Sequence, residues 1–239
     1  MGTATSPWRA NYYKQDAPPR GGVAAVFPNG PRTTLAQAFH TWLTAPSAQL
    51  ALIALVLALV LRIVVGTYTW WDLVVVVALV GFHPMTEWLI HTFILHAKPV
   101  KVGAGQYQSL VAREHVRHHK DPKELETIFI PLPVVLAMVT LPWLLLLVPW
   151  FNTGLVLTGL TAAFAILTVY EWTHFLIHTP YRPKGRYYRY IRRAHILHHY
   201  KNEHYWLGVT VHTADHLLGT FPDKSTVPTS PTAKDLAAR

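Results

Sequence analysis

Four long apolar segments dominate the chain. The first covers residues 48–65 (AQLALIALVLALVLRIVV) and has Arg62 as its only charge; the others cover residues 71–95, 132–150 and 155–177. Each comes close to or exceeds the roughly 20 residues that an α-helix needs to cross a bilayer. We therefore expect four transmembrane helices, with the side chain of Arg62 extending to the membrane surface near the end of the first.

The connections between these segments predict two helical hairpins. A short turn around Gly66 joins the first two segments, and the turn Asn152-Thr153-Gly154 joins the last two. Residues 1–46 are polar and rich in Pro and Gly, so we expect a poorly ordered or interfacial N-terminal arm. The chain is then predicted to consist of this arm, a membrane domain over residues 47–221 and a flexible C-terminal tail over residues 222–239.

Composition supports the membrane assignment. Charged residues make up only 14% of the chain, against about 25% in typical soluble domains, and the mean hydropathy is +0.22. Cysteine is absent, which excludes disulfides, iron–sulfur clusters and thiolate zinc sites. Any metal ion must therefore be bound by nitrogen and oxygen ligands.

The net charge of +9 is distributed unevenly along the chain. Of the 21 Lys and Arg residues, all but Arg62 lie in the N-terminal arm, between Lys98 and Lys123, or from Arg182 onward. Because positive loops are retained in the cytoplasm, the arm, the middle loop and the tail are predicted to be cytoplasmic. This distribution favours an anionic lipid surface over nucleic acid as the partner of the basic residues.

Ten histidines form four clusters close to the predicted cytoplasmic ends of the helices. Two clusters lie at the ends of the second and fourth apolar segments as HTFILH and HFLIH, and two have the pattern His-x-x-His-His. Imidazole is the commonest metal ligand among side chains, and ten imidazoles exceed what one ion can use. The sequence therefore predicts a cytoplasmic, helical, two-metal centre with the following ligands: His91, His96, His115, His118, His119, His174, His178, His195, His198 and His199.

The spacing within the clusters adds local detail. Each His-x-x-His-His triplet places its three imidazoles on one face of a helix. His91 and His96 are five residues apart and do not share a face in an ideal α-helix, which indicates a distorted helix end. The segment from Glu87 to His91 resembles the segment from Glu171 to His174, which favours two related half-sites.

Five other histidines are not assigned as ligands. His40 and His83 are isolated, and we interpret both as hydrogen-bonded core residues. The other three surround the last cluster and are expected to line the pocket or to form an interfacial network: His204, His212 and His216.

The four clusters, in this order and attached to two membrane hairpins, resemble the histidine boxes of the integral-membrane fatty acid hydroxylase and sterol desaturase superfamily. The segment from Gly208 to Thr220 is similar to the end of that family's catalytic domain, although Ala214 stands where the family usually has an aromatic residue. The resemblance covers roughly residues 70–221. Box spacing is most similar to that of fatty acid 2-hydroxylases, whereas carotenoid hydroxylases usually have a wider third gap.

The resemblance implies a di-iron oxygenase that hydroxylates a long-chain fatty acyl or related lipid with O2. Zinc cannot activate dioxygen, although it can replace iron during purification. Electrons are expected from an external donor of the cytochrome b5 or ferredoxin type. Nearby carboxylates are expected to orient the imidazoles: Glu87, Glu171 and Asp215. Glu171 is also a less favoured candidate for direct ligation, because Glu-x-x-His occurs in soluble di-iron bundles.

Several alternatives remain open on the sequence alone. A desaturase acting on a lipid, sterol or carotenoid could use the same centre. A histidine-rich metal-binding membrane protein or a transporter is a more distant possibility, since a transporter should have ionisable groups near the membrane midplane. The membrane could be a bacterial inner membrane or the endoplasmic reticulum.

Overall fold

The four predicted membrane helices are present in the computed structural model, which describes residues 23, 27, 30, 33–103 and 105–238. Within the predicted arm, residues 1–22, 24–26, 28–29 and 31–32 lie outside the described residues. Helices long and apolar enough to cross a membrane cover Pro46–Val65, Trp70–Leu95, Leu125–Leu147 and Thr153–His178. These bounds confirm the predicted segments to within a few residues, except that the third begins and ends earlier than expected.

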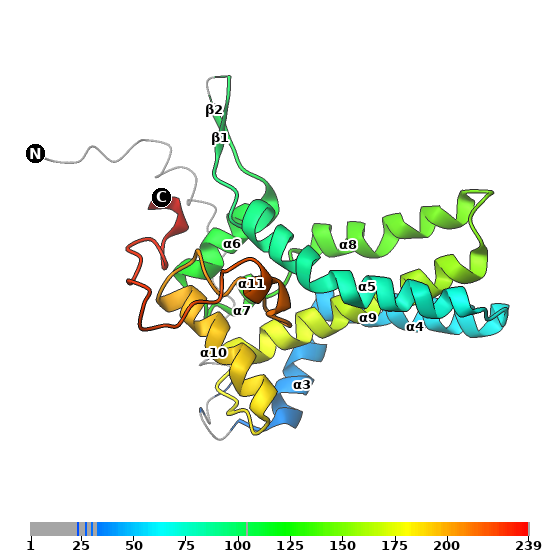
Figure 1. Cartoon of the computed structure of the whole chain (residues 1–239), viewed down its shortest axis with the longest axis horizontal. Helices are drawn as coiled ribbons and strands as arrows, with labels where there is room; N and C mark the ends of the chain where they lie inside the picture. Colours follow the sequence, from blue (N-terminus) through cyan, green and yellow to red (C-terminus); the bar gives the residue numbers. More distant parts are fainter. Residues whose placement is uncertain (1–22, 24–26, 28–29, 31–32, 104, 239) are drawn as a thin grey trace, which may run out of the picture.

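The helices run side by side on one side of the molecule (Figure 1). Helix α9 (Thr153–His178) packs against α4 (Pro46–Val65) and α5 (Trp70–Leu89), and α4 also packs against α8 (Leu132–Thr140). The remaining helices gather at one end of this bundle (Figure 1): α6 (Leu110–Lys120), α7 (Leu125–Ile128), α10 (Arg186–Tyr200) and α11 (Thr213–Leu217).

Local sequence signals set the helix ends. Pro46 occupies the first turn of α4, where its missing N–H is not needed, and Gly66 ends the helix with a φ of 68°. Thr69 and Asp72 form a capping box at the start of α5. Helix α8 gives way to the 3-10 helix η3 (Leu141–Leu147), which has a proline at its start, so the third span is not a regular α-helix throughout.

Outward-facing positions of the bundle are apolar. Val64 on α4 and Leu73 and Phe82 on α5 are 75%, 67% and 71% exposed, respectively. A soluble protein rarely exposes such a continuous apolar surface, whereas lipid tails cover it in a membrane. The structure therefore supports a multi-pass membrane protein.

Arg62 does not extend to the membrane surface as expected from the sequence. It is buried, and its guanidinium donates to Asp72 Oδ1 at 2.8 Å, to Thr158 Oγ1 at 2.7 Å and to the carbonyl of Thr67 at 2.9 Å. Arg62 can form an ion pair with Asp72 because the turn after Gly66 brings the start of α5 beside the end of α4. This network joins both helices of the first hairpin to α9.

Three further elements were not predicted from the sequence. Helix α3 (Leu35–Leu43) forms part of the predicted arm and buries Trp42 against α9. A two-stranded antiparallel hairpin of β1 (Val100–Val102) and β2 (Gly105–Tyr107) extends from the middle loop (Figure 1). The predicted flexible tail instead lies against the histidine helices, with Val227, Ala233 and Leu236 buried, because these apolar side chains find a surface to cover there.

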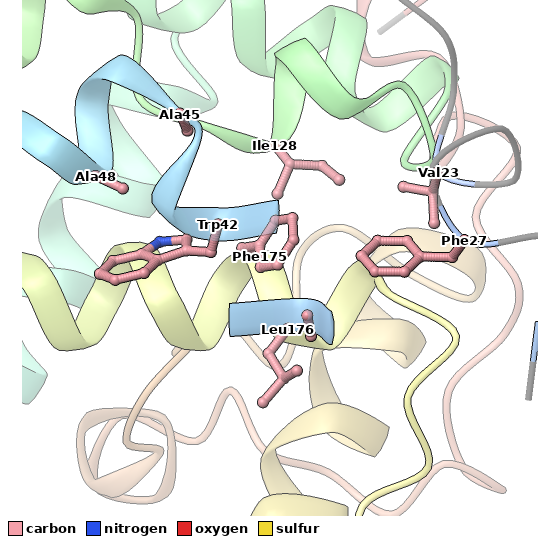
Figure 2. Close-up of a cluster of buried hydrophobic side chains, with 9 residues drawn as sticks. Val23, Phe27, Trp42, Ala45, Ala48, Ile128, Phe175 and Leu176 are labelled. Atoms are coloured by element: carbon pink, nitrogen blue, oxygen red, sulfur yellow. The ribbon is translucent and has the colours of Figure 1, made fainter. Parts of the chain in front are cut away.

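A hydrophobic cluster connects the membrane helices to the histidine-rich end. Figure 2 shows the side chains of Trp42, Ile128 and Phe175 gathered where α3, α7 and α9 meet. Because Phe175 lies next to His174 in the chain, this cluster fixes the position of α9 at the point where its histidines begin.

The Arg62 network predicts a specific pattern of stability. R62M should lower the melting temperature of the detergent-purified protein, because it leaves the Asp72 carboxylate without its cation. R62M/D72N should recover part of that loss, since a neutral amide needs no counter-charge and can still accept the capping hydrogen bond. The control I63M changes a neighbouring exposed side chain and should have little effect. A double variant no more stable than R62M would contradict this interpretation.

Candidate metal centre

The first pair of histidines is brought to one face by a change of helix type. After Leu89 the second span continues as the π-helix η2 (Ile90–Leu95), in which the hydrogen-bonded spacing is five residues. The amide of His96 accordingly donates to the carbonyl of His91 at 3.1 Å. This confirms the distortion predicted from the five-residue spacing and places both imidazoles on the same side.

The other eight histidines come from three α-helices. His174 and His178 occupy the last turns of α9, whereas α6 and α10 each supply one His-x-x-His-His triplet. Ser109 caps α6 by accepting from the amide of Ala112. Five of these imidazoles are completely buried: His118, His119, His195, His198 and His199.

The ten imidazoles form two compact groups. In each group, one nitrogen from every ring lies within 4.8 Å of the corresponding nitrogens of the other four. The first group contains His91, His96, His115, His119 and His198, and the second contains His118, His174, His178, His195 and His199. The groups are adjacent, since the rings of His119 and His199 have centroids 4.2 Å apart.

The division into groups follows a regular exchange. The three histidines of each triplet, at the first, fourth and fifth positions of the pattern, do not stay together. On α6 the i and i+4 histidines join the first group, while the i+3 histidine joins the second. Helix α10 does the reverse, so His195 and His199 join the second group and His198 the first. Each half of the chain thus contributes four imidazoles to one group and one to the other. The triplets were expected to act as single faces, but neighbouring rings diverge enough to serve two centres.

The spacing of nitrogens within a group fits a metal ion. His115 Nε2 lies 3.2 Å from both His91 Nε2 and His119 Nε2, and His195 Nε2 lies 3.0 Å from both His178 Nε2 and His199 Nε2. Two nitrogens bound at right angles at about 2.1 Å from one ion would be about 3.0 Å apart. The donor set therefore has the dimensions of a coordination shell.

Backbone carbonyls fix several of these rings from outside. In the first group, His91 Nδ1 donates to the carbonyl of Leu207 at 2.5 Å and His198 Nδ1 donates to that of Tyr205 at 2.9 Å. Because Nδ1 carries the proton, Nε2 presents its lone pair to the group. The residue between the two carbonyls, Trp206, has a φ of 55°, a left-handed conformation that is uncommon for a large side chain.

Two more carbonyls act in the same way from distant parts of the chain. His174 Nδ1 donates to the carbonyl of Ile128 at 2.7 Å, and His119 Nδ1 donates to the carbonyl of Ala233 at 2.8 Å. Ala233 belongs to the C-terminal segment, so that segment reaches a ring of the first group directly. Main-chain acceptors of this kind leave no residue-type signal, and sequence reasoning missed all four.

The three predicted carboxylates hold the loops that supply these carbonyls. Glu87 Oε1 accepts from the amides of Val209 and Thr210 at 3.1 and 3.0 Å, just after Leu207. Glu171 Oε1 accepts from the amide of Ile130 at 2.9 Å, just after Ile128. The two halves of the chain therefore repeat one arrangement. A carboxylate on a membrane helix accepts from the amide of a loop, and a carbonyl of that loop accepts from an imidazole on the same membrane helix.

Asp215 completes the loop of the first group. Its carboxylate accepts from the amides of Leu207 and Gly208 at 2.9 and 2.7 Å and from His212 Nδ1 at 2.8 Å. Burial opposes ionisation, but these hydrogen bonds, with one from Thr220, outweigh it and lower the pKa of Asp215. Gly208 is required by this close approach, since a Cβ there would collide with the carbonyl of Val211.

Burial also sets the protonation of the clustered imidazoles. It holds the pKa of His115, His118, His195 and His199 well below the usual value, and the neighbouring imidazoles lower it further. Neutral imidazoles are the form that binds metal ions.

The unassigned histidines lie outside both groups. His83 Nε2 is 2.9 Å from Thr210 Oγ1, in agreement with its interpretation as a hydrogen-bonded residue, whereas His40 is exposed on α3 rather than part of the core. His212 is buried beside Asp215, and the exposed His216 contacts the hydroxyl of Tyr190. His204 lies 3.5 Å from the buried carboxylate of Glu203.

The fold and the site together define a multi-pass membrane protein whose paired histidine groups have the geometry to hold two metal ions. The profile of the fatty acid hydroxylase family matches residues 75–220, which is more than half of the chain. The chain belongs to this family.

Similar proteins agree with this assignment. A dihydroceramide fatty acyl 2-hydroxylase of Arabidopsis thaliana is 26% identical over 140 residues, which cover 58% of this chain and 56% of that protein. The fatty acid 2-hydroxylase of Homo sapiens is 27% identical over 145 residues, covering 59% of this chain and 37% of the human protein. The matches thus span about a third to a half of these relatives.

The fold is also similar to that of a solved structure. The hydroxylase domain of full-length Scs7p superposes with a TM-score of 0.57 and 18% identity, covering 85% of this chain and 72% of that one. At this identity the similarity concerns the fold.

Adjacent residues on α6 allow a matched test of the two groups. The parent protein is expected to hold two metal ions per chain, whereas H118A and H119A should each retain one. The ion that is lost should differ, because His118 and His119 belong to different groups. Metal analysis by mass spectrometry after chelator competition would measure this. Loss of both ions in each variant, or of neither, would contradict two separate groups.

The hydrogen bond between His119 and the C-terminal segment predicts that truncation affects the two histidine groups differently. Removal of residues 231–239 deletes the carbonyl that holds His119 and should weaken metal binding in the first group by about 10–100-fold, the usual effect of losing an outer hydrogen bond. The second group should be unaffected, so truncation should reduce metal retention further in H118A than in H119A. The control D235N removes only the ion pair between Asp235 and Lys120 and should retain both ions. Equal losses from the two groups would show that the segment acts only on global stability.

Proposed function

We propose that this protein is a membrane di-iron hydroxylase that inserts oxygen into a long-chain fatty acyl or related lipid. The observation that carries the proposal is the convergence of ten buried imidazoles into two five-nitrogen groups within the region that matches the hydroxylase family. The names of the similar proteins, fatty acid 2-hydroxylases, support an acyl substrate.

The proposed ligands are the five histidines of each group defined above. When bound there, iron would supply the redox chemistry needed to activate O2 and attack an unactivated C–H bond, which zinc cannot supply. Zinc bound after purification would then be a replacement for the native ion.

The chain's own residues prepare this chemistry in two ways. Complete burial of rings such as His118 and His198 excludes bulk water from the centre. The carbonyls of Leu207, Ile128 and Ala233 fix ring orientation, so the donor atoms are held in place before the metal ions bind.

The surroundings of the site suit a lipid substrate. An apolar groove of about 720 Å³ lies along α9, with Phe39 and Trp42 of α3, Leu52 of α4, and Val169 and Trp172 of α9 among its lining residues. A separate cavity of about 260 Å³ is lined by His178 of the second group. We propose that an acyl chain reaches the centre from the bilayer while its polar end stays at the membrane surface.

The proposal includes the cellular setting expected from the sequence. Both termini and the metal centre would lie in the cytoplasm, at a bacterial inner membrane or the endoplasmic reticulum. Electrons would come from an external donor of the cytochrome b5 or ferredoxin type, and nucleic acid would not be a partner.

Two alternatives are distinguished by structure or by product. Desaturation at the same centre would begin with the same hydrogen abstraction, so product analysis must decide between the two outcomes. A metal transporter is less consistent with the arrangement, because the histidines lie at one end of the membrane helices and Arg62 and Asp72 pair with each other within the chain.

Lipid analysis in cells that produce the protein tests the proposed activity. The parent should convert a deuterated long-chain fatty acyl lipid to a hydroxylated product, whereas H118A and H198A should lose at least about 99% of this product, as expected when a metal ligand is lost. The control H204A replaces an exposed histidine outside both groups and should behave like the parent. Product formation in H118A and H198A equal to that of the parent would contradict the proposed function, and an alkene product would assign a desaturase.

A further inference from the structure

Helix α10 has a cationic face in addition to the one that carries its histidines. Arg189, Arg192, Arg193, Ile196 and Leu197 follow the i, i+3, i+4, i+7, i+8 spacing of one helix face, and they line a pocket of about 450 Å³ with Arg182 of the preceding loop. The pocket therefore combines four guanidinium groups with an apolar floor.

Of the four arginines of this pocket, Arg193 lies within electrostatic reach of the Asp223 carboxylate. Within the described part of the chain, no Asp or Glu forms an ion pair with Arg182, Arg189 or Arg192. The buried Nε of Arg192 also has no hydrogen-bond acceptor among these residues. An unsatisfied buried donor is costly, so an anionic ligand at this position would stabilise the pocket.

The pocket is next to the candidate metal centre. Arg192 and Ile196 line both the arginine pocket and the 260 Å³ cavity that contains His178. His178 ends α9, and Arg182 follows it after a short loop, which places the pocket where the fourth membrane span leaves the bilayer. A molecule with an anionic head and a long apolar tail could therefore place its head among the arginines close to the centre.

We propose that this arginine pocket binds the phosphate headgroup of an anionic lipid. This inference rests on the proposed function, since it identifies the class of lipid that the hydroxylase holds beside its centre. Guanidinium groups bind phosphate through paired charge-assisted hydrogen bonds. A concave pocket with Ile196 and Leu197 at its floor suits an amphiphile better than the surface of an acidic protein.

Native mass spectrometry of the metal-loaded, full-length protein in mixed micelles, with no electron donor present, can test this binding without turnover. The probes are phosphatidic acid and the diacylglycerol with the same acyl chains, which differ only in the phosphate. The test variant is R189Q/R192Q. The control K98Q/K101Q removes the same charge from exposed positions in and beside the β1–β2 hairpin.

We expect one phosphatidic acid to be retained per chain by the parent and by K98Q/K101Q. Its affinity should fall by at least about tenfold in R189Q/R192Q, which corresponds to the loss of about one charge-assisted contact, while weak diacylglycerol binding should not change. Iron binding by R189Q/R192Q should equal that of the parent, which shows that the variant is folded.

Three results would overturn the inference. Equal loss in both variants would indicate diffuse charge attraction, and displacement of the lipid by inorganic phosphate at similar concentration would indicate a site for free phosphate. Unchanged lipid retention in R189Q/R192Q, with slower reduction by an acidic electron donor, would assign the face to a protein partner. Failure of the hydroxylase itself would appear separately, as absence of product in the parent.

Discussion

Ten imidazoles are buried together at one end of an apolar helix bundle, and this arrangement constrains the rest of the structure. A buried polar group without a partner costs about 1–3 kcal/mol, and here the Nε2 atoms of neighbouring rings face one another at 3.0–3.2 Å. Where Nδ1 is hydrogen-bonded to a carbonyl, Nε2 has only a lone pair to offer. Metal ions would pair with these lone pairs, so the bundle, the π-helix and the loops can all be understood as supports for two proposed metal ions.

The two groups depend on each other through the exchanged histidines. His118 belongs to the group whose other four members come from the second half of the chain. His198 belongs to the group whose other four members come from the first half. Because each group needs a residue from both hairpins, neither can be completed before the hairpins associate. The repeated arrangement of a carboxylate, a loop carbonyl and an imidazole, seen for Glu87 and His91 and again for Glu171 and His174, supports the internal repeat noted in the sequence.

Sequence reasoning succeeded where residue type or spacing carries the signal. The apolar segments predicted the membrane helices, and the five-residue spacing of His91 and His96 predicted the distorted helix end. It failed where contacts depend on the backbone or on tertiary packing. The carbonyl of Ala233, the left-handed Trp206 and the internal pairing of Arg62 with Asp72 depend on which segments meet in space. The burial of Val227, Ala233 and Leu236 in the tail also depends on which segments meet, because these apolar side chains are covered only after the chain has folded.

The membrane boundary connects the proposed chemistry to a proposed substrate. The cavity at His178 shares Arg192 with the arginine pocket, so the centre and a candidate site for a lipid headgroup are neighbours. A polar end held at the surface would leave the acyl chain to occupy the apolar side of the molecule. This arrangement would explain why the basic residues after α9 are interleaved with apolar positions of α10.

Anomalous X-ray diffraction at the iron absorption edge, measured on crystals of the iron-loaded protein, would test the central claim most directly. We predict two peaks per chain, one enclosed by His91, His96, His115, His119 and His198, and the other by His118, His174, His178, His195 and His199. A single peak, or peaks located away from these imidazoles, would contradict the account.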